Sequence, residues 1–222
     1  MKLFVNGAPL LTPLTGIGRY TWQLCQQMAH QSDIDLLMAY GMRYEHGLRM
    51  PTHGAINALQ TAGYGVLRRL LPNPRLIKRT VEKARFAWVE RQIIRQGYLY
   101  HEPNILPLPY AGPTIITLHD LSCYDHPETH PAERMEIMHR ELPDVIERVD
   151  HIIVISDATR RAVAQRFGVP DSRMTVTLLA AHPSFAPRPA ANLQAALAKL
   201  ELQPGGYLLS VGTLEPRKNL TT

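Results

Sequence analysis

Two adjacent cations near the end of the sequence, Arg217 and Lys218, are residue types that bind a diphosphate. Paired positive side chains neutralise phosphate oxygens, and arginine adds bidentate hydrogen bonds. They follow residues 207–211, an apolar run that predicts a short buried strand, and Gly212, which breaks that strand. In α/β domains the loops at the carboxyl ends of strands form the ligand crevice, so we predict a phosphate-binding turn here.

A second anion site is predicted where Gly16 and Gly18 open a helix near the start of the chain. Glycine lets backbone N–H groups approach a ligand, and the helix dipole favours negative charge at this end. A tight turn explains the same two residues equally well. Thr21 stands where the dinucleotide-binding fingerprint needs its third glycine, which disfavours a nicotinamide enzyme.

Polar residues that can bind sugars or exchange protons follow two predicted strands. His119 and Asp120 end the strand 114–118 and are predicted as catalytic residues, because histidine bonds hydroxyls or transfers protons near neutral pH. His101 and Asn104 follow the strand 98–100 and are predicted to line an acceptor pocket. The alternatives are a histidine satisfied by a nearby carbonyl and an asparagine that only shapes a turn.

The sequence lacks the residues that several other kinds of chemistry require. His126 and His130 have a metal-like i, i+4 spacing, but the neighbouring prolines disfavour a helix there, so we expect no metal site and no cofactor. Cys25 and Cys123 match no metal spacing and suit a reducing, cytoplasmic setting. The nucleophile elbow and the phosphate loop of nucleoside triphosphatases are both missing from the sequence.

The elements that must position these residues alternate between strands and helices. Continuous apolar runs predict buried strands, which indicates an α/β, doubly wound parallel sheet covered on both faces. The predicted strands are 2–5, 34–40, 98–100, 114–118, 151–155, 174–179 and 207–211. One predicted helix starts at Gly16, and two more span 75–95 and 132–149. A fourth spans 158–167 and is capped by Ser156 or Asp157, and a fifth spans 193–200 and is capped by Asn192. Residues 41–65 are expected to be irregular.

The helix 75–95 carries two apolar stripes on nearly opposite sides, and most of the chain's positive charge lies around it. One stripe is Ile77, Val81, Ala84 and Trp88, and the other is Phe86, Val89 and Ile93. Residues 66–96 hold nine Lys/Arg and two acids, within a whole-chain net charge of +5. This suits contact with an anionic membrane surface, while a solvated helix face is the plain alternative. No nucleic-acid-reading motif accompanies the charge, so nucleic acid is not an expected partner.

Five motifs together resemble group 1 (family 4) glycosyltransferases, in the order and approximate spacing of that family. They are Gly16-Ile17-Gly18-Arg19-Tyr20, His101-Glu102-Pro103-Asn104, Thr117-Leu118-His119-Asp120-Leu121, Val154-Ile155-Ser156-Asp157-Ala158-Thr159-Arg160 and Gly212-Thr213-Leu214-Glu215-Pro216-Arg217-Lys218-Asn219. The resemblance covers essentially the whole chain and extends to bacterial mannosyltransferases of surface-polysaccharide assembly.

The resemblance implies a retaining GT-B enzyme whose two Rossmann-like halves bind the acceptor and a nucleotide sugar. Residues 1–181 would form the acceptor domain, residues 182–205 a linker and helix, and residues 206–222 the start of the donor domain. Gly16, Gly18, Arg217 and Lys218 would bind the donor diphosphate without an obligatory metal, and His119 would contact the transferred sugar or the acceptor. GDP-mannose is the expected donor and a glycan or lipid-linked glycan the expected acceptor, at the cytoplasmic face of the membrane.

The same resemblance implies that this polypeptide is inactive alone. The family's donor domain carries a pair of glutamates seven residues apart, which would lie beyond Thr222. We therefore expect a folded, truncated, acceptor-side half. A non-catalytic sugar- or partner-binding module of the same fold is the alternative. An epimerase needs a Tyr-x3-Lys pair, which the sequence lacks.

Overall fold

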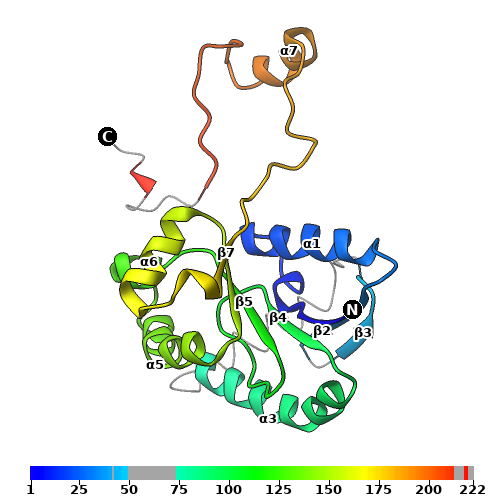
Figure 1. Cartoon of the computed structure of the whole chain (residues 1–222). Helices are drawn as coiled ribbons and strands as arrows, with labels where there is room; N and C mark the ends of the chain where they lie inside the picture. The colour runs from blue at the N-terminus through cyan, green and yellow to red at the C-terminus, as the bar shows by residue number, and fades with distance from the viewer. Residues whose placement is uncertain (42, 50–73, 213–217, 220–222) are drawn as a thin grey trace. The chain divides into compact units, whose positions relative to one another are not determined.

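The computed structural model describes residues 1–41, 43–49, 74–212 and 218–219, and some side chains of the helix that begins at Pro74 are not described. The chain divides into two compact units, Met1–Leu178 and Leu179–Thr222. The first unit contains a seven-stranded sheet in the order β3-β2-β1-β4-β5-β6-β7, parallel except for β3 (Figure 1). The strands are β1 (Lys2–Asn6), β2 (Asp35–Tyr40), β3 (Arg43–His46), β4 (Leu99–Glu102), β5 (Thr114–Leu118), β6 (His151–Val154) and β7 (Met174–Val176).

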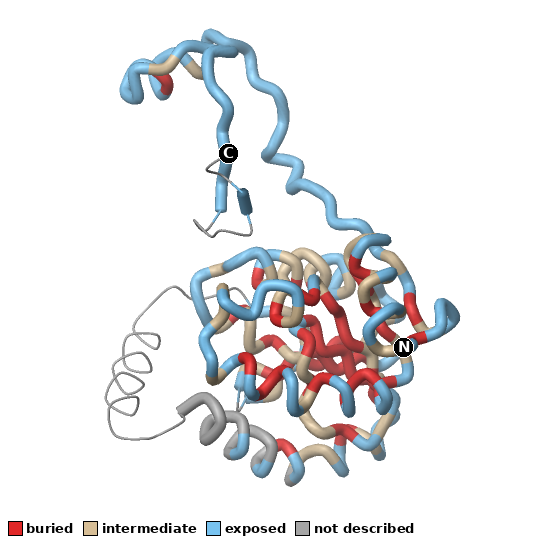
Figure 2. Tube along the Cα trace, turned by 90° about the vertical axis from the view of Figure 1, so that its left-hand side faces the viewer, coloured by how far each residue is buried: buried red, intermediate tan, exposed pale blue. Residues whose placement is uncertain are grey.

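Helices cover both faces of this sheet, as the predicted doubly wound α/β class requires. The longer helices of the first unit are α1 (Gly16–Ala29), α3 (Pro74–Arg95), α5 (Ala132–Arg148) and α6 (Asp157–Phe167). Leu3 and Val5 of β1 share a cluster with Cys25 of α1, whereas Phe4 points to the opposite face and packs with Phe86 of α3. The buried residues lie mainly in the interior of this unit (Figure 2) and form three clusters. The predicted Rossmann-like arrangement is confirmed.

The ends of the helices follow local chemistry. Ser156 Oγ accepts the Thr159 N–H at 3.1 Å and caps α6, and Gly168 ends that helix with a φ of 66°. Arg173 Nη2 donates to the Ile146 carbonyl at 2.8 Å and so satisfies the carboxyl end of α5. The short α4 (Ser122–Asp125) and the 3₁₀ turn η2 (Pro127–Thr129) lie between β5 and α5.

Four local predictions were wrong. Residues 43–46, expected to be irregular, form β3, which pairs with β2; residues 50–65 lie outside the described part. Residues 207–211, expected to be a buried strand, have no regular structure, and Leu208 is fully exposed. Helix α7 (Ala190–Ala198) begins after Pro189 instead of at an Asn192 cap. Strand β7 ends at Val176, where the sequence predicts a strand reaching residue 179.

Of the two predicted stripes on α3, the one containing Phe86 and Ile93 is buried. These side chains are 1% and 4% exposed, and the Phe86 ring stacks on Phe4 at 5.7 Å between centroids. Ala84, from the other stripe, is exposed, and the side chains of Ile77, Val81 and Trp88 lie outside the described ones.

The sheet order creates a switch point between β1 and β4. The chain leaves β1 toward β2 and β3 on one side and returns to β4 on the other side of β1. Ligands of open α/β sheets bind beyond the carboxyl ends of the strands at such a point. The end of β1 at Asn6 and the end of β4 at Glu102 therefore mark where a site is expected.

Outside α7, the described part of the second unit consists of turns and irregular chain and is mostly exposed. In the described residues of both units, no helix is long and apolar enough to cross a membrane.

Candidate active site

Polar side chains gather at the carboxyl ends of β1, β4 and β5 in two hydrogen-bonded groups, one on each face of the sheet. Side chains alternate between the faces along a strand, so His101 and Thr117 lie on the α1 face. Glu102 lies on the α3 face, together with Asn6. The turn that follows β4 joins the two groups.

On the α1 face, the Thr117 hydroxyl is the centre of the group. His101 Nε2 lies 2.8 Å from Thr117 Oγ1, and the Tyr20 hydroxyl lies 3.2 Å from the same oxygen. His101 is only 2% exposed, and burial, followed by the nearby His119, lowers its pKa to about 4. His101 is therefore neutral at physiological pH and lies below the surface of the predicted acceptor pocket.

On the α3 face, the Glu102 carboxylate accepts hydrogen bonds from Asn6, Tyr100 and Asn104. Asn6 Nδ2 and the Tyr100 hydroxyl donate to Oε2 at 2.7 and 2.9 Å, and the Asn104 N–H donates to Oε1 at 2.9 Å. The Asn6 bond crosses from β1 to β4 at the switch point. Asn104 is exposed, so its side chain, unlike that of His101, is accessible to a ligand.

His119 lies where the two groups meet. Its Nε2 is 2.9 Å from the carbonyl oxygen of Pro103, and the Tyr20 ring packs edge-on against the imidazole with centroids 5.0 Å apart. A carbonyl oxygen only accepts, so Nε2 carries the proton. Burial lowers the His119 pKa, although the Pro103 bond and Asp120 oppose this. The half-buried ring is thus neutral near pH 7, and its Nδ1 accepts no hydrogen bond from the described residues.

Asp120 is exposed beside His119 and starts the next helix. Its Oδ1 accepts the Ser122 N–H at 3.0 Å. A neutral imidazole nitrogen and a carboxylate at one sheet edge can both accept hydrogen bonds from sugar hydroxyls. The arrangement therefore suits hydroxyl recognition.

The two glycines at the start of α1 have different surroundings. A Cβ on Gly18 would lie 2.9 Å from the Pro9 carbonyl oxygen, so this glycine permits close packing of the loop on the helix. Gly16 is exposed, and a Cβ there would meet nothing within 4 Å. Gly16 is thus the glycine with free space for a ligand.

Three other cations of the quoted motifs are Arg217, Lys218 and Arg160. Arg217 lies outside the described residues, and Lys218, which is exposed, belongs to the second unit. Arg160 is held in exposed ion pairs with Asp171 at 2.6 Å and Asp157 at 3.2 Å. In the part of the chain that the structure covers, no three His, Cys, Asp or Glu side chains form a metal-binding group.

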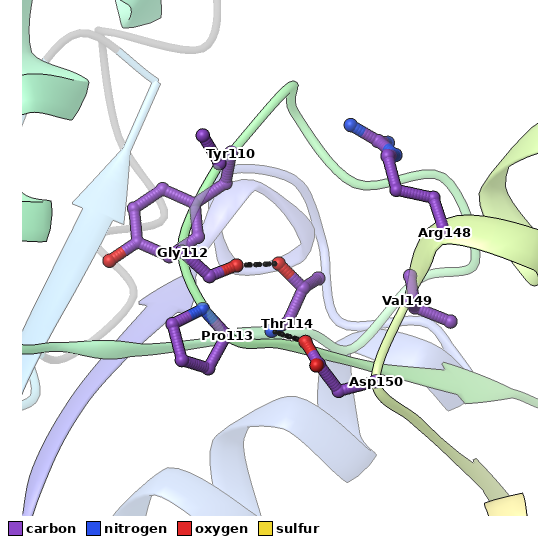
Figure 3. A pocket seen from close by; sticks show the side chains of 8 residues that line it. Tyr110, Gly112, Pro113, Thr114, Arg148, Val149 and Asp150 are labelled. Carbon is purple, nitrogen blue, oxygen red and sulfur yellow. Dashed lines mark hydrogen bonds between the residues drawn. The ribbon is translucent and has the colours of Figure 1, made fainter.

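A cavity of about 400 Å³ lies at the opposite edge of the sheet (Figure 3). It is bordered by residues 110–114, before and at the start of β5, and by residues 148–150, which precede β6. Thr114 closes its floor, with its N–H donating to Asp150 Oδ2 at 2.7 Å and its hydroxyl donating to the Gly112 carbonyl at 3.1 Å. None of the predicted site residues borders this cavity.

Comparison with known proteins identifies the family. The family model described as "Glycosyltransferase Family 4" matches residues 14–178, which is the sheet-bearing unit without its first residues. The chain belongs to glycosyltransferase family 4. Over 227 aligned residues it is also 31% identical to the O-antigen chain mannosyltransferase B of Escherichia coli. That alignment covers 99% of this chain and 58% of the relative.

Sequence reasoning missed three residues of this candidate site: Tyr20, Thr117 and Glu102. All three lie within motifs quoted for the resemblance, but their roles depend on contacts between elements. The sequence did offer one signal for Glu102, because it stands at the end of a buried strand. Glutamate is seldom buried, and a buried carboxylate needs hydrogen-bond partners, which indicates a polar group around it.

Proposed function

We propose that this glycosyltransferase chain supplies the acceptor-side half of a retaining, GT-B-type mannosyltransferase. The donor is GDP-mannose, and the acceptor is a glycan or lipid-linked glycan of surface-polysaccharide assembly. One observation carries the proposal: His119, at the end of β5 and beside the switch point, has Nε2 bonded to the Pro103 carbonyl, while its Nδ1 accepts no hydrogen bond from the described residues. The similarity to a mannosyltransferase of O-antigen synthesis supports the sugar and the class of acceptor.

In this proposal the chain's residues orient hydroxyls and stabilise the leaving diphosphate. His119 Nδ1 accepts a hydrogen bond from a hydroxyl of the transferred sugar or the acceptor, and Asp120 and Asn104 contact the acceptor. The backbone of Gly16 at the start of α1 approaches the diphosphate. Arg217 and Lys218 neutralise the charge that develops as the nucleotide departs, which is the main electrostatic task of the reaction.

We also propose that the 222-residue chain does not transfer sugar by itself. It spans 58% of the length of the relative that it matches, and its described residues form one sheet, not two facing ones. The test replaces the matching part of the E. coli mannosyltransferase B with residues 1–178 of this chain. We expect mannose transfer from GDP-mannose by the hybrid, none from UDP-glucose, and none by the 222-residue chain alone.

The hybrid also tests the role of His119. His119→Ala should reduce kcat/KM by about 100-fold or more, the range for a group that bonds the reacting centre. His46→Ala is the matched control, because His46 is exposed and pairs with Asp35, at the amino end of β2. A folded hybrid that retains full activity without the His119 imidazole would contradict the proposal.

A peripheral membrane contact through residues 66–96 is a separate part of the proposal. Residues 66–73 and most α3 side chains up to Lys83 lie outside the described ones, but Arg91 and Arg95 are exposed. Each well-placed cation contributes about 1 kcal/mol on anionic lipid. Vesicle co-sedimentation should rise with phosphatidylserine content and fall with salt. Binding indifferent to both would refute the electrostatic contact.

A further inference from the structure

Glu102 is a buried carboxylate to which the proposed reaction assigns no task. It is 1% exposed at the end of β4, where an ionised group is costly unless hydrogen bonds replace its water. Its partners come from three places: Asn6 on β1, Tyr100 on β4 itself, and the Asn104 backbone in the turn beyond. The carboxylate therefore ties this turn to the two strands at the switch point.

The turn that Glu102 holds is strained. Ile105 has a φ of 68°, a conformation that a β-branched residue rarely adopts, and it persists only where the surroundings impose it. The Leu106 N–H donates to the Asn104 carbonyl at 2.8 Å and closes the turn around Ile105, and three further contacts hold this conformation. Glu102 Oε1 accepts the Asn104 N–H, the Ile105 N–H donates to the Thr117 carbonyl at 3.3 Å, and the Ile105 side chain is buried in the core.

The strained turn presents the carbonyl of Pro103 to His119. This carbonyl accepts the Nε2–H of His119 at 2.9 Å. The same bond defines the tautomer of the imidazole, because an acceptor at Nε2 leaves Nδ1 without a proton. A short path of contacts thus leads from the Glu102 carboxylate, through residues 103–104, to the ring of His119.

We propose that Glu102 is a positioning residue: its carboxylate holds the turn 103–105 so that the Pro103 carbonyl keeps His119 in the Nε2–H tautomer. Nδ1 is then directed to accept a hydrogen bond from a sugar hydroxyl, a last step that rests on the proposed function. Glu102 itself touches no substrate. The Asn6 bond couples the arrangement to β1, and so to the opposite side of the switch point.

The test is the tautomer of His119, read from ¹⁵N shifts of the ring nitrogens in the 222-residue chain without any sugar. Glu102→Gln leaves one side-chain oxygen, which we expect to take the place of Oε2 because Oε2 accepts from two donors. The NH₂ group then takes the place of Oε1 and faces the Asn104 N–H, so two donors meet and this hydrogen bond is lost. We expect the Nδ1–H tautomer to become populated and Asn104 amide exchange to rise by about tenfold or more, as for loss of a hydrogen bond to a charged acceptor.

A second variant breaks the same bond from its other side. Asn104→Pro removes the backbone N–H at an exposed position and leaves the buried carboxylate in place, so it carries the test if Glu102→Gln does not fold. Tyr100→Phe is the matched control. It removes a buried donor from Oε2 and the acceptor of the Leu108 N–H, but no hydrogen bond of residues 103–105, and should lower stability while His119 remains Nε2–H.

A folded Glu102→Gln or Asn104→Pro chain with the wild-type His119 tautomer would overturn the inference, as would an Nδ1–H tautomer in the wild type. Because the measurement needs neither donor nor acceptor, it stands apart from the sugar-transfer assays. A hybrid enzyme that fails to use GDP-mannose would refute the proposed function and leave the positioning role of Glu102 untouched.

Discussion

Two histidines at the carboxyl ends of neighbouring strands differ in their exposure to solvent. His119 is half-buried at the rim, with one nitrogen bonded to a carbonyl and the other available to a ligand. His101 is enclosed beneath it, against the Thr117 hydroxyl. The same residue type is therefore accessible to a ligand in one place and part of the interior in the other.

Burial of His101 predicts a loss of stability in acid. Its pKa is lowered to about 4 in the folded chain from 6.5, so the unfolded state binds a proton that the folded state refuses. The contribution of neutral His101 to the unfolding free energy is fully present above pH 6.5 and is lost as the pH falls toward 4. At about 1.4 kcal/mol per pH unit, His101 should remove about 3 kcal/mol from the unfolding free energy across this window.

Urea denaturation at several pH values checks this prediction. His101→Gln keeps a polar atom near Thr117 but does not titrate, so its stability should depend less on pH between 6.5 and 4. His119, whose pKa is also lowered, remains in the variant and keeps part of the slope. Parallel curves for the two proteins would show that His101 is not buried in its neutral form.

At the scale of single residues, the sequence predicts where the candidate site residues lie, but not which of them are buried and which are accessible to a ligand. Placement after strands brings His101, Asn104, His119 and Asp120 to the same sheet edge, because parallel strands share their carboxyl ends. Which imidazole is enclosed depends on the strand register and on Tyr20 of α1, neither of which the local sequence specifies.

Among the elements, the start of α1 separates two glycines that look equivalent in sequence. Gly18→Ala should destabilise the chain by about 1–3 kcal/mol, because the new methyl group meets the Pro9 carbonyl, a backbone atom that moves only with its loop. Gly16→Ala has open space and serves as the control, with unchanged stability. Thermal melts of both variants check this, and equal melting temperatures would contradict the close packing.

Helix α3 offers a similar contrast between its two stripes. Phe86→Ala should cost about 3–5 kcal/mol, since the ring is 1% exposed and stacks on Phe4 within an aromatic cluster. Ala84→Gln changes an exposed position of the other stripe and should stay within about 0.5 kcal/mol of the parent. Chemical denaturation measures both. A larger loss for Ala84→Gln would mean that α3 is rotated from the position described.

The elements differ in how well their sequences predict them. Strand β5 has the predicted bounds, because three apolar and two β-branched threonine side chains in five residues lie between turn-forming neighbours. Strand β3 was missed because Arg-Tyr-Glu-His lacks an apolar pattern, and only pairing with β2 makes it a strand. Residues 207–211 have a strand-like composition, but in the described chain they pair with nothing and remain exposed.

At the scale of the whole molecule, local sequence patterns do not predict the order of the strands in the sheet. Alternating strands and helices predict a parallel sheet, but the return of the chain from β3 to β4 beside β1 is a long-range choice. That choice brings Asn6 within 2.7 Å of Glu102 and so creates the polar group at the switch point. The class of fold was predictable, whereas the contacts that complete the site required the assembled sheet.

The division of the chain at Leu178 predicts that the sheet-bearing unit folds independently. All three buried clusters, and every strand of the sheet, lie within residues 1–178. Hydrophobic burial is the main source of folding free energy, so a chain ending at Leu178 should unfold cooperatively with nearly the melting temperature of the 222-residue protein. Residues 179–212 are largely exposed and contribute one buried apolar side chain, Leu197.

Circular dichroism melts of the two chains, with Phe86→Ala introduced into each, measure this independence. The substitution should lower both melting temperatures by the same amount, because its contacts with Phe4 and Tyr100 are internal to the first unit. A shortened chain that melts many degrees earlier, or without cooperativity, would show that residues 179–222 complete its core. The sheet and its histidine-bearing edge would then depend on a segment that the family match leaves out.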